Sequence, residues 1–239
     1  MLLGSFSTCA KTNRTLLLKP RLRMVGLCCA NCWPPKLPIH RNSFTKMLFG
    51  VDYVIRELKP SDRINSFKTG AAAFAPLKSF LRNQAKDFHT GNIAKTYVAI
   101  KLLVDKDVPV IEPVEDDVSG ILGYLTLTCS EIDIRNGYAL EDCQYANRYE
   151  SLPAVKIARL AVDERYRGVR VGENLVSIAL AIAADVIAPA VGCRFVVTDA
   201  KSEAVKFYTR TGFTLLDTDV NRQSETPVMF IDLLPLMTE

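Results

Sequence analysis

The sequence predicts an α/β (α+β) protein in which strands and helices alternate along a chain of 239 residues. Its composition, 49% hydrophobic and 23% charged, is that of a folded domain rather than a disordered or fibrous chain. Runs rich in Val, Ile, Leu and Tyr alternate with segments whose apolar residues recur at helical spacing. The predicted order of elements is β-α-α-β-β-β-α-β-α-β-β.

The first segment differs from the rest of the chain. Residues 1–46 hold eight Lys and Arg and no acidic residue, whereas the whole chain has a net charge of +4. Three interpretations are open: an organelle transit peptide, a flexible nucleic-acid-binding arm, or no biological segment, since Met47 could be the true start. We favour the last and expect a basic, disordered extension over 1–46, followed by a single domain over 47–239.

The seven cysteines do not predict a disulfide framework or a metal site. Cys29 and Cys32 form a CxxC pair, but a zinc knuckle needs a second pair at matching spacing. We interpret them as free thiols and expect no metal. A secretory signal is not evident, and the most apolar stretch, 178–184, is cut short by Asp185 and Pro189. These features favour a cytoplasmic protein that does not cross a membrane.

The first half of the chain predicts strands and helices in turn. Residues 52–58 favour a strand that stops before Pro60, Ser61 and Asp62 favour the start of a short helix that ends at Gly70, and Pro76 opens a stronger helix that ends at Gly91. Strands are expected over 96–104 and 121–129, joined by an acidic loop, and an irregular stretch follows over 131–152.

The last third has the most regular pattern. The expected elements are a strand over 154–162, a helix over 171–188 stopped by Pro189, a strand over 195–198, a helix from Ser202 to Thr211 ended by Gly212, and strands over 213–216 and 228–233. On the first of these helices, the face expected to be buried carries Leu175, Ile178, Ala179, Ile182 and Val186.

The turn between the 154–162 strand and the helix predicts an anion site. Residues 163–173 hold Gly168, Gly172 and the arginines 165, 167 and 170, directly before a helix N-terminus. Unpaired N–H groups and the helix dipole at such a turn attract a phosphate or pyrophosphate. Neither a Walker loop nor a dinucleotide fingerprint is present, and a plain turn with solvated arginines is the alternative.

A second block of residues adds to this motif. Residues 195–201 are followed by a helix that contains Phe207-Tyr208 and then by Gly212-Phe213. Together the two blocks resemble the GNAT acetyltransferase superfamily, over roughly residues 50–239. The family's pyrophosphate loop, Gln/Arg-x-x-Gly-x-Gly/Ala, corresponds to residues 167–172, with Arg170 in place of the first motif glycine. The N–H of Arg170 can still serve if this residue does not need a positive φ.

The resemblance implies a GNAT fold, with a central mixed, mostly antiparallel, twisted sheet flanked by helices. It also implies acetyl-CoA as the co-substrate and no metal. The residues expected to bind acetyl-CoA are Leu160, Ala161, Val162, Arg167, Gly168, Val169, Arg170, Val171, Gly172, Glu173, Asp199 and Ala200. The strand at 160–162 would pair with the pantetheine arm, and strand-end N–H groups near Val162 could stabilise the oxyanion.

Tyr208 resembles the family's general-acid tyrosine and would protonate the departing thiolate. Its reference pKa of about 10 keeps a tyrosine protonated at neutral pH. The alternative is a core aromatic residue with a satisfied hydroxyl. Neither His40 nor His89 is near the motifs, so a general base is not evident. An α-amine, with a pKa of about 7.7–8.0, needs a base less than a lysine side chain does.

Residues 153–163, 199–201 and 67–70 are similar to the stand-alone GNAT toxins of bacterial toxin–antitoxin pairs. That resemblance implies acetylation of aminoacyl-tRNA, a block of translation, a ribbon-helix-helix antitoxin as partner and, by analogy, a homodimer. The side chains expected to contact tRNA are Lys78, Arg82, Lys86, Arg159 and Arg165. A solvated helix face is the alternative for the three on the helix. A GNAT enzyme for a small amine or a protein N-terminus, and a non-catalytic acyl-CoA-binding module, are the competing functions.

Overall fold

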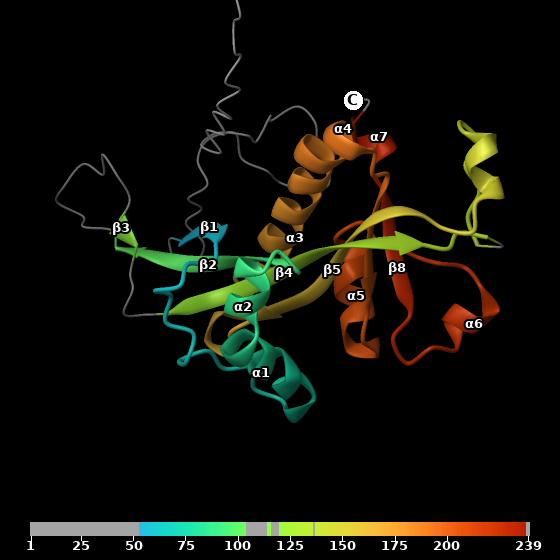
Figure 1. Ribbon diagram of the computed structural model, residues 1–239. Coiled ribbons are helices and arrows are strands. Elements are labelled where there is room, and N and C mark those ends of the chain that lie inside the picture. Colours follow the sequence, from blue (N-terminus) through green and yellow to red (C-terminus); the bar gives the residue numbers. More distant parts are fainter. Residues whose placement is uncertain (1–52, 104–113, 116–119, 136, 238–239) are drawn as a thin grey trace, which may run out of the picture.

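The computed structural model describes residues 53–103, 114–115, 120–135 and 137–237. The expectations for the 1–46 extension, for its CxxC pair and for most of the acidic loop concern residues outside these ranges. The described chain forms one twisted sheet with helices on both faces (Figure 1).

The sheet is mixed and mostly antiparallel, as the resemblance implied. Its strands are β1 (Tyr53–Glu57), β2 (Lys95–Leu103), β3 (Val114–Glu115), β4 (Ile121–Ile132), β5 (Leu152–Val162), β6 (Phe195–Asp199), β7 (Thr214–Leu215) and β8 (Val228–Asp232). They lie in the order β1-β2-β4-β5-β6-β8-β7, with β3 paired to β2. Among the described strands, only β5 and β6 pair in parallel. The helix between these two strands is the crossover that a parallel pair requires.

The α-helices are α1 (Ala75–Asn83), α2 (Ala85–Thr90), α3 (Val171–Ile182), α4 (Ala188–Val191), α5 (Ser202–Arg210), α6 (Asp219–Arg222) and α7 (Leu234–Met237). Helices α1 and α2 cover one face of the sheet, where Phe80 and Leu81 pack against strand residues such as Tyr124. Helices α3 and α5 pack on the opposite face, with Leu175 and Tyr208 in a second cluster. The sheet thus separates two apolar layers.

The helix expected over 61–70 is not formed. Pro60 is followed by a turn in which the Asp62 carboxylate accepts hydrogen bonds from the Arg56 guanidinium and from the N–H of Lys59. The carboxylate of Asp62 therefore faces back toward β1 and does not cap a helix. The helix expected over 76–91 is present, but it is divided at Gln84 into α1 and α2.

The helix after β5 also departs from expectation, because Pro189 does not stop it. A π-helical turn over Ala183–Ile187 leads directly into α4, in which Pro189 occupies the first turn and needs no N–H partner. Leu175 and Ala179 are buried as expected, whereas Ile178 and Ile182 are partly exposed and Val186 is exposed. The remaining buried positions are Val171, Gly172, Val176, Leu180 and Ala183.

The helical stretch Val171–Val191 has the length and apolar composition of a membrane span, contrary to the shorter stretch expected from the sequence. Core helices of globular proteins can share that length and composition. Its inner face packs against the sheet, where Leu175, Ala179 and Leu180 are buried. This face of the helix therefore belongs to the core of the domain.

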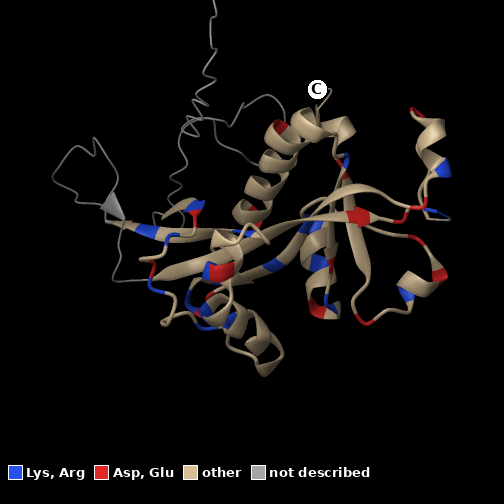
Figure 2. Ribbon diagram, viewed as in Figure 1, with Lys and Arg blue, Asp and Glu red and all other residues tan. Residues whose placement is uncertain are grey.

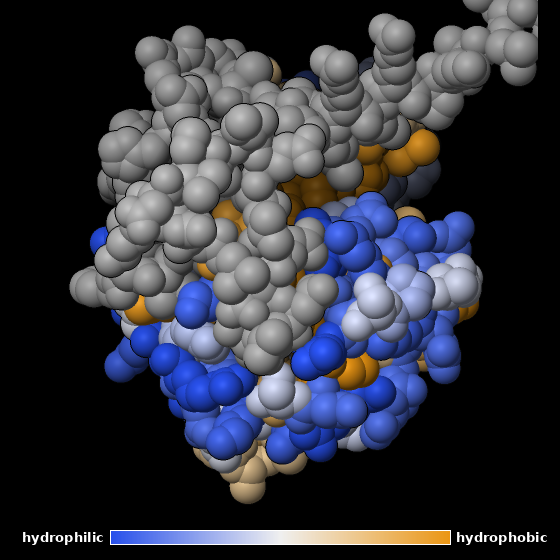
Figure 3. Space-filling view, turned by 90° about the vertical axis from the view of Figure 1, so that its left-hand side faces the viewer, coloured by the Kyte–Doolittle hydropathy of each residue, from blue (hydrophilic) through white to orange (hydrophobic). Residues whose placement is uncertain are grey.

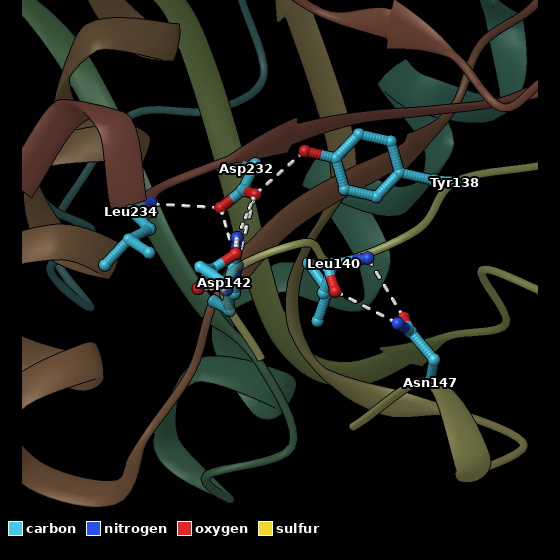
Figure 4. A network of polar contacts seen from close by, with 7 residues as sticks. Tyr138, Leu140, Asp142, Asn147, Asp232 and Leu234 are labelled. Carbon is cyan, nitrogen blue, oxygen red and sulfur yellow. Dashed lines mark hydrogen bonds and ion pairs between the residues drawn. The ribbon is translucent and has the colours of Figure 1, made fainter. Parts of the chain in front are cut away.

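A network of ion pairs and hydrogen bonds holds the loop between β4 and β5 against the end of the sheet (Figure 4). Arg194 bonds to the carboxylates of both Asp142 and Asp232, and the Tyr138 hydroxyl donates to Asp232 at 3.0 Å. Bonds to these two carboxylates raise the pKa of Arg194 against the opposing effect of burial. The loop between β4 and β5 includes the exposed 3-10 helix η2 (Gln144–Arg148).

Candidate active site

Strands β5 and β6 separate soon after they pair. Their ladder joins only Ala154–Lys156 to Phe195–Val197. Within the described chain, no strand pairs with the rest of β5 on that side. Next to the separation, β5 has one extra residue, Ala158, between the partners of Leu127 and Thr126 on β4. Such a bulge bends a strand and increases its twist, so it helps to divert β5 from β6. We call the region where the two strands diverge the fork.

The alternation of the main chain shows which groups of β5 face the fork. The N–H of Asp163 donates to the carbonyl of Leu122 at 2.8 Å, so it points toward β4. Successive N–H groups of a strand point to opposite edges. The N–H groups of Val162 and Leu160 therefore point into the fork, and that of Ala161 points toward β4. Two predicted residues thus offer main-chain donors on an unpaired edge, and the third does not.

The turn after β5 offers more unpaired main-chain donors. Within the described chain, no N–H group from Arg167 to Glu173 donates to a protein acceptor, and the next one, at Asn174, donates to Arg170. The first turn of α3 begins at Val171, where the helix dipole adds partial positive charge. These groups can bind an anion, as expected from the sequence.

The turn needs two positive backbone angles. Gly168 has φ of 84° and Arg170 has φ of 58°. The left-handed conformation is unfavourable for a residue with a Cβ atom, so Arg170 is strained where the family pattern has glycine. The condition that this residue avoids a positive φ is not met, although its N–H still lies in the unpaired row.

Two of the three arginine side chains of the turn are already engaged. Arg165 pairs with the carboxylate of Asp163 at 2.8 Å, and Asp163 is fully buried. Burial opposes ionisation of Asp163, but hydrogen bonds from Arg165 and from the Lys68 N–H hold the pKa of its carboxyl below the ordinary value. Arg167 donates to the carbonyl of Thr69. Arg165 therefore stabilises the turn, and the main chain provides the donors for an anion.

Gly172 lets α3 approach α5 closely. A Cβ atom on Gly172 would lie 3.3 Å from the Phe207 ring and 3.5 Å from a methyl group of Val162. The Phe207 ring in turn lies 5.2 Å from the ring of Tyr208, measured between centroids. The predicted anion-binding turn and the predicted acid are thus connected through one layer of packed side chains.

Tyr208 lies at the base of the fork. It is 6% exposed, and its ring also contacts Phe213 at 5.2 Å. Burial raises the pKa of Tyr208, and a hydrogen bond with Thr198 partly offsets this effect. The Thr198 hydroxyl donates across the fork to the carbonyl of Ile157 at 3.2 Å. The phenol is therefore protonated at neutral pH, as a general acid must be.

The two predicted cofactor residues after β6 have structural partners. Asp199 forms an ion pair with Lys156 at 2.5 Å, and the N–H of Ala200 donates to the carbonyl of Pro227 at 2.9 Å. Their contact with acetyl-CoA stays a prediction. The described residues contain no group of three or more His, Cys, Asp or Glu side chains that could hold a metal.

The side chains predicted to contact tRNA differ in whether they already have hydrogen-bond or ion partners. Lys86 donates to the carbonyls of Pro60 and Asp62, and Arg82 donates to that of Asn65. Lys78 has no hydrogen-bond or ion partner within the described chain, and the Arg159 guanidinium lies over the Phe80 ring at 5.1 Å. Lys and Arg are frequent around α1, α2 and the turn, and the surface there is largely hydrophilic (Figures 2 and 3).

Sequence reasoning missed the segment Lys68–Phe74 as part of the site, because a helix was expected up to Gly70. It also missed Lys201, which contacts that segment. The available signal was a run of small residues, 70–73, that contains a glycine and precedes a single aromatic residue and Pro76. Gly70 and Pro76 break a regular helix across this run, and the structure forms only a short 3-10 helix there, Ala72–Phe74.

An unpaired strand edge that leads to a main-chain anion site suits an extended ligand ending in phosphates. The fold and this geometry are those expected of an acyl-CoA-dependent N-acetyltransferase. Residues 110–213 match the acetyltransferase (GNAT) family. The matched residues include the turn after β5, β6 and Tyr208, and the enzymes of this family use acetyl-CoA.

Solved structures share the fold. A Tyr-to-Phe mutant of KacT is 24% identical with a TM-score of 0.59, over 77% of this chain and 96% of that chain. AtaT complexed with acetyl-methionyl-tRNAfMet is 23% identical with a TM-score of 0.58, over 76% of this chain and 95% of that chain. A structure described as a bacterial toxin is 16% identical with a TM-score of 0.59, over 77% of this chain and 93% of that chain. No curated protein matches the sequence significantly.

Proposed function

We propose that the protein transfers an acetyl group from acetyl-CoA to the α-amino group of aminoacyl-tRNA and blocks translation as a toxin. The observation that carries the proposal is the fork, which has unpaired donors along β5 and Tyr208 at its base. The described structure also aligns with AtaT, which was solved with acetyl-methionyl-tRNAfMet. A toxin of this type would act in the cytoplasm.

The fork fits acetyl-CoA by the chemistry of its donors. The N–H groups of Leu160 and Val162 match the amide carbonyls of a pantetheine arm, and the unpaired N–H groups of 167–173 match a pyrophosphate. Gly168 has no atom within 4 Å of the position of an added Cβ atom, so a bulky phosphate can approach there. Acetyl-CoA supplies the activated acetyl group.

The transfer needs one acid. The neutral amine attacks the acetyl carbonyl carbon, the carbon–sulfur bond breaks, and the amine nitrogen releases its extra proton to solvent. Tyr208 donates the phenolic proton to the departing thiolate and then regains one from solvent. The N–H of Val162 points into the fork and would stabilise the charge that develops on the carbonyl oxygen.

An aminoacyl ester suits this site because its α-amine is largely neutral near pH 8 without a base. Lys78 and Arg159 have charges available for tRNA phosphates, whereas Arg82 also donates to the carbonyl of Asn65. A ribbon-helix-helix antitoxin would be the partner, and a homodimer the assembly. In support, AtaT is solved with the C-terminus of its antitoxin AtaR, and KacTA in complex with DNA.

The test is transfer of label by the full chain from radiolabelled acetyl-CoA to a mixed aminoacyl-tRNA pool. Label that enters the RNA fraction and is released with the amino acid on mild base treatment supports the proposal. Acetyl-CoA binding with no label on RNA contradicts the choice of acceptor, and a screen of small amines and N-terminal peptides then follows.

Tyr208→Phe should bind acetyl-CoA with an unchanged Kd and lose about 10²–10⁴-fold in kcat, because only the proton donor is removed. Unchanged kcat in Tyr208→Phe would overturn the assignment of the acid.

The kcat/KM of the unaltered protein should rise with pH through about 8 as the α-amine deprotonates. Since burial raises the pKa of Tyr208, kcat/KM should not fall again up to pH ~10.

A further inference from the structure

The segment Lys68–Phe74 joins the two walls of the fork, and we call it the strap. On the side of β5, the Lys68 N–H donates to Asp163 at 2.9 Å, and the Lys68 carbonyl accepts from the N–H of Glu164 at 3.0 Å. On the side of β6, the Lys201 ammonium donates to the carbonyl of Ala73 at 2.8 Å. The strap therefore crosses from the anion-binding turn to the start of α5, the helix that carries Tyr208.

Phe74 is the one aromatic residue of the strap, and it follows four small residues over 70–73. It is partly buried and belongs to none of the three apolar clusters of the described chain. Its ring has two cations as neighbours, Arg167 at 5.8 Å and Lys201 at 5.8 Å from the centroid. One cation comes from each wall of the fork.

The contribution of Phe74 to the stability of the fold does not explain its position between two cations. A phenylalanine contributes most to stability when it is packed among apolar side chains, and Phe74 is outside those clusters. Contacts between cations and an aromatic ring at exposed sites are weak. The same combination, an aromatic face with cations beside it, is what proteins use to bind single-stranded nucleotides.

We propose that Phe74, with Lys201 and Arg167, is a stacking platform for an unpaired nucleotide next to the aminoacylated 3′ end of the acceptor RNA. The inference rests on the proposed function and identifies a specificity-determining residue for it. The base would stack on the Phe74 ring in place of one of its cation contacts. The Lys201 ammonium would meet the adjacent phosphate, and α1 with Lys78 begins directly after the strap.

The position of the strap supports this role. Its anchors at Asp163 and Lys201 flank the fork, so an acceptor that reaches the base of the fork passes the strap. The exposed Arg159, also on the last part of β5, offers a further cation on the side of α1. A small amine that carries no nucleotide would have no base to stack on the Phe74 ring and no phosphate for the two cations, so this arrangement would not increase its binding affinity.

The test compares Phe74→Ala, Phe74→Trp and Phe74→Leu in the full chain. With aminoacyl-tRNA as the acceptor, Phe74→Ala and Phe74→Leu should raise KM about ten-fold, whereas Phe74→Trp should retain it. The Kd for acetyl-CoA should stay within about two-fold for all three variants, since they leave the main-chain donors of the turn in place. Tyr145→Ala is the matched control, because Tyr145 pairs with Arg148 at 4.9 Å on η2, before the start of β5.

A second measurement uses a fluorescent single-stranded RNA that ends in CCA and carries no amino acid. The unaltered protein should bind it, and Phe74→Ala should bind it about ten-fold more weakly. If tRNA is not acetylated but this difference in binding remains, the proposed function fails and the platform stands. Equal effects of Phe74→Trp and Phe74→Ala on KM, or equal RNA binding by Phe74→Ala and the unaltered protein, would overturn the platform.

Discussion

At the scale of single residues, Arg170 shows how the turn differs from the family pattern. It adopts φ of 58°, a conformation that glycine takes without the clash of a Cβ atom. Its side chain offers little in compensation, because its Nε lies 3.9 Å from the Glu173 carboxylate and both groups are exposed. The unpaired N–H groups of this turn are in the main chain, so the strain at Arg170 does not remove them.

Arg170→Gly should therefore stabilise the protein by up to about 1 kcal/mol, because it removes the left-handed strain. In a chain of this size the melting temperature would rise by about 2–4 °C. Gly168→Ala is the opposite change at φ of 84°, with free space for the Cβ atom, and it should destabilise the protein through the backbone alone. Thermal unfolding of both variants is the measurement, and a lower melting temperature for Arg170→Gly would contradict the prediction.

Residue-scale prediction from the sequence was best where chemistry is local. The glycines of the turn predicted its close main-chain geometry, and both glycines lie in the row of unpaired N–H groups. The assignment of Tyr208 as the acid came from the resemblance and stays a prediction. The engagement of Arg165 by Asp163 and of Lys86 by the carbonyls of Pro60 and Asp62 was not predictable, because each partner is set by folding.

At the scale of elements, α1 and α2 present cations with different roles. Lys86 on α2 satisfies carbonyls of the preceding loop, whereas Lys78 on α1 has no polar partner within the described chain. One helical stripe in the sequence thus divides into a structural cation and a free one. Spacing alone places both on one face and cannot separate them.

Lys78→Glu should raise KM for aminoacyl-tRNA without a loss of stability above about 0.5 kcal/mol, because the charge is free. In a plot of log K for tRNA against log salt concentration, the magnitude of the slope should decrease by about 0.7–0.9 for each phosphate contact that is removed. Lys86→Glu, the matched reversal, should instead lower stability by about 1 kcal/mol through two lost hydrogen bonds. An unchanged slope for Lys78→Glu would show that this face is only solvated.

The missed element is the strap, and the reason is a competition among local signals. Ser61 and Asp62 favour a helix start, and Gly70 favours an end, so a helix between them was the expected result. In the structure, Asp62 pairs with Arg56 on β1, and Phe67 is fully buried in the cluster that contains Tyr124. These long-range partners outweigh the local preference for a short helix.

At the scale of the whole molecule, Asp163 joins parts that are far apart in sequence. Its carboxylate accepts from Lys68, 95 residues earlier, and pairs with Arg165 in the turn. The pKa of Asp163 is lowered despite burial, and so is that of Asp62. Both carboxylates therefore stabilise the folded state above the pKa of an unfolded aspartate, about 3.9, and this contribution is lost as the pH falls through the folded-state pKa.

Asp163→Asn should destabilise the protein by about 1–3 kcal/mol at pH 7, because a buried ionised acceptor is lost. The difference from the unaltered protein should begin to shrink below pH ~4, where the unfolded carboxylate becomes protonated, and should be lost as the pH falls through the lower pKa of the folded state. Denaturant unfolding at pH 7 and at pH ~3 measures both values. A difference in stability that is equal at the two pH values would rule out the ionised carboxylate as its source.

The sequence predicted the order of strands and helices well in the second half of the chain, where helices and strands are long and regular. The order of strands within the sheet was not predicted, because local periodicity does not show which distant strands pair, and the mixed, mostly antiparallel sheet came from the resemblance. The continuation through Pro189 was missed because a π-helical turn before it accommodates the proline. The separation of β5 from β6 likewise depends on contacts across the sheet.

The separation of β5 from β6 also bears on aggregation. A free strand edge can recruit a strand of another chain, and proteins usually cover or shorten such edges. Here the free edge is the last half of one strand in the middle of a sheet, with α3 and α5 packed at Gly172 and Phe207 beside it. The domain thus exposes main-chain donors to a slender ligand while it leaves too little edge for a second polypeptide to extend the sheet.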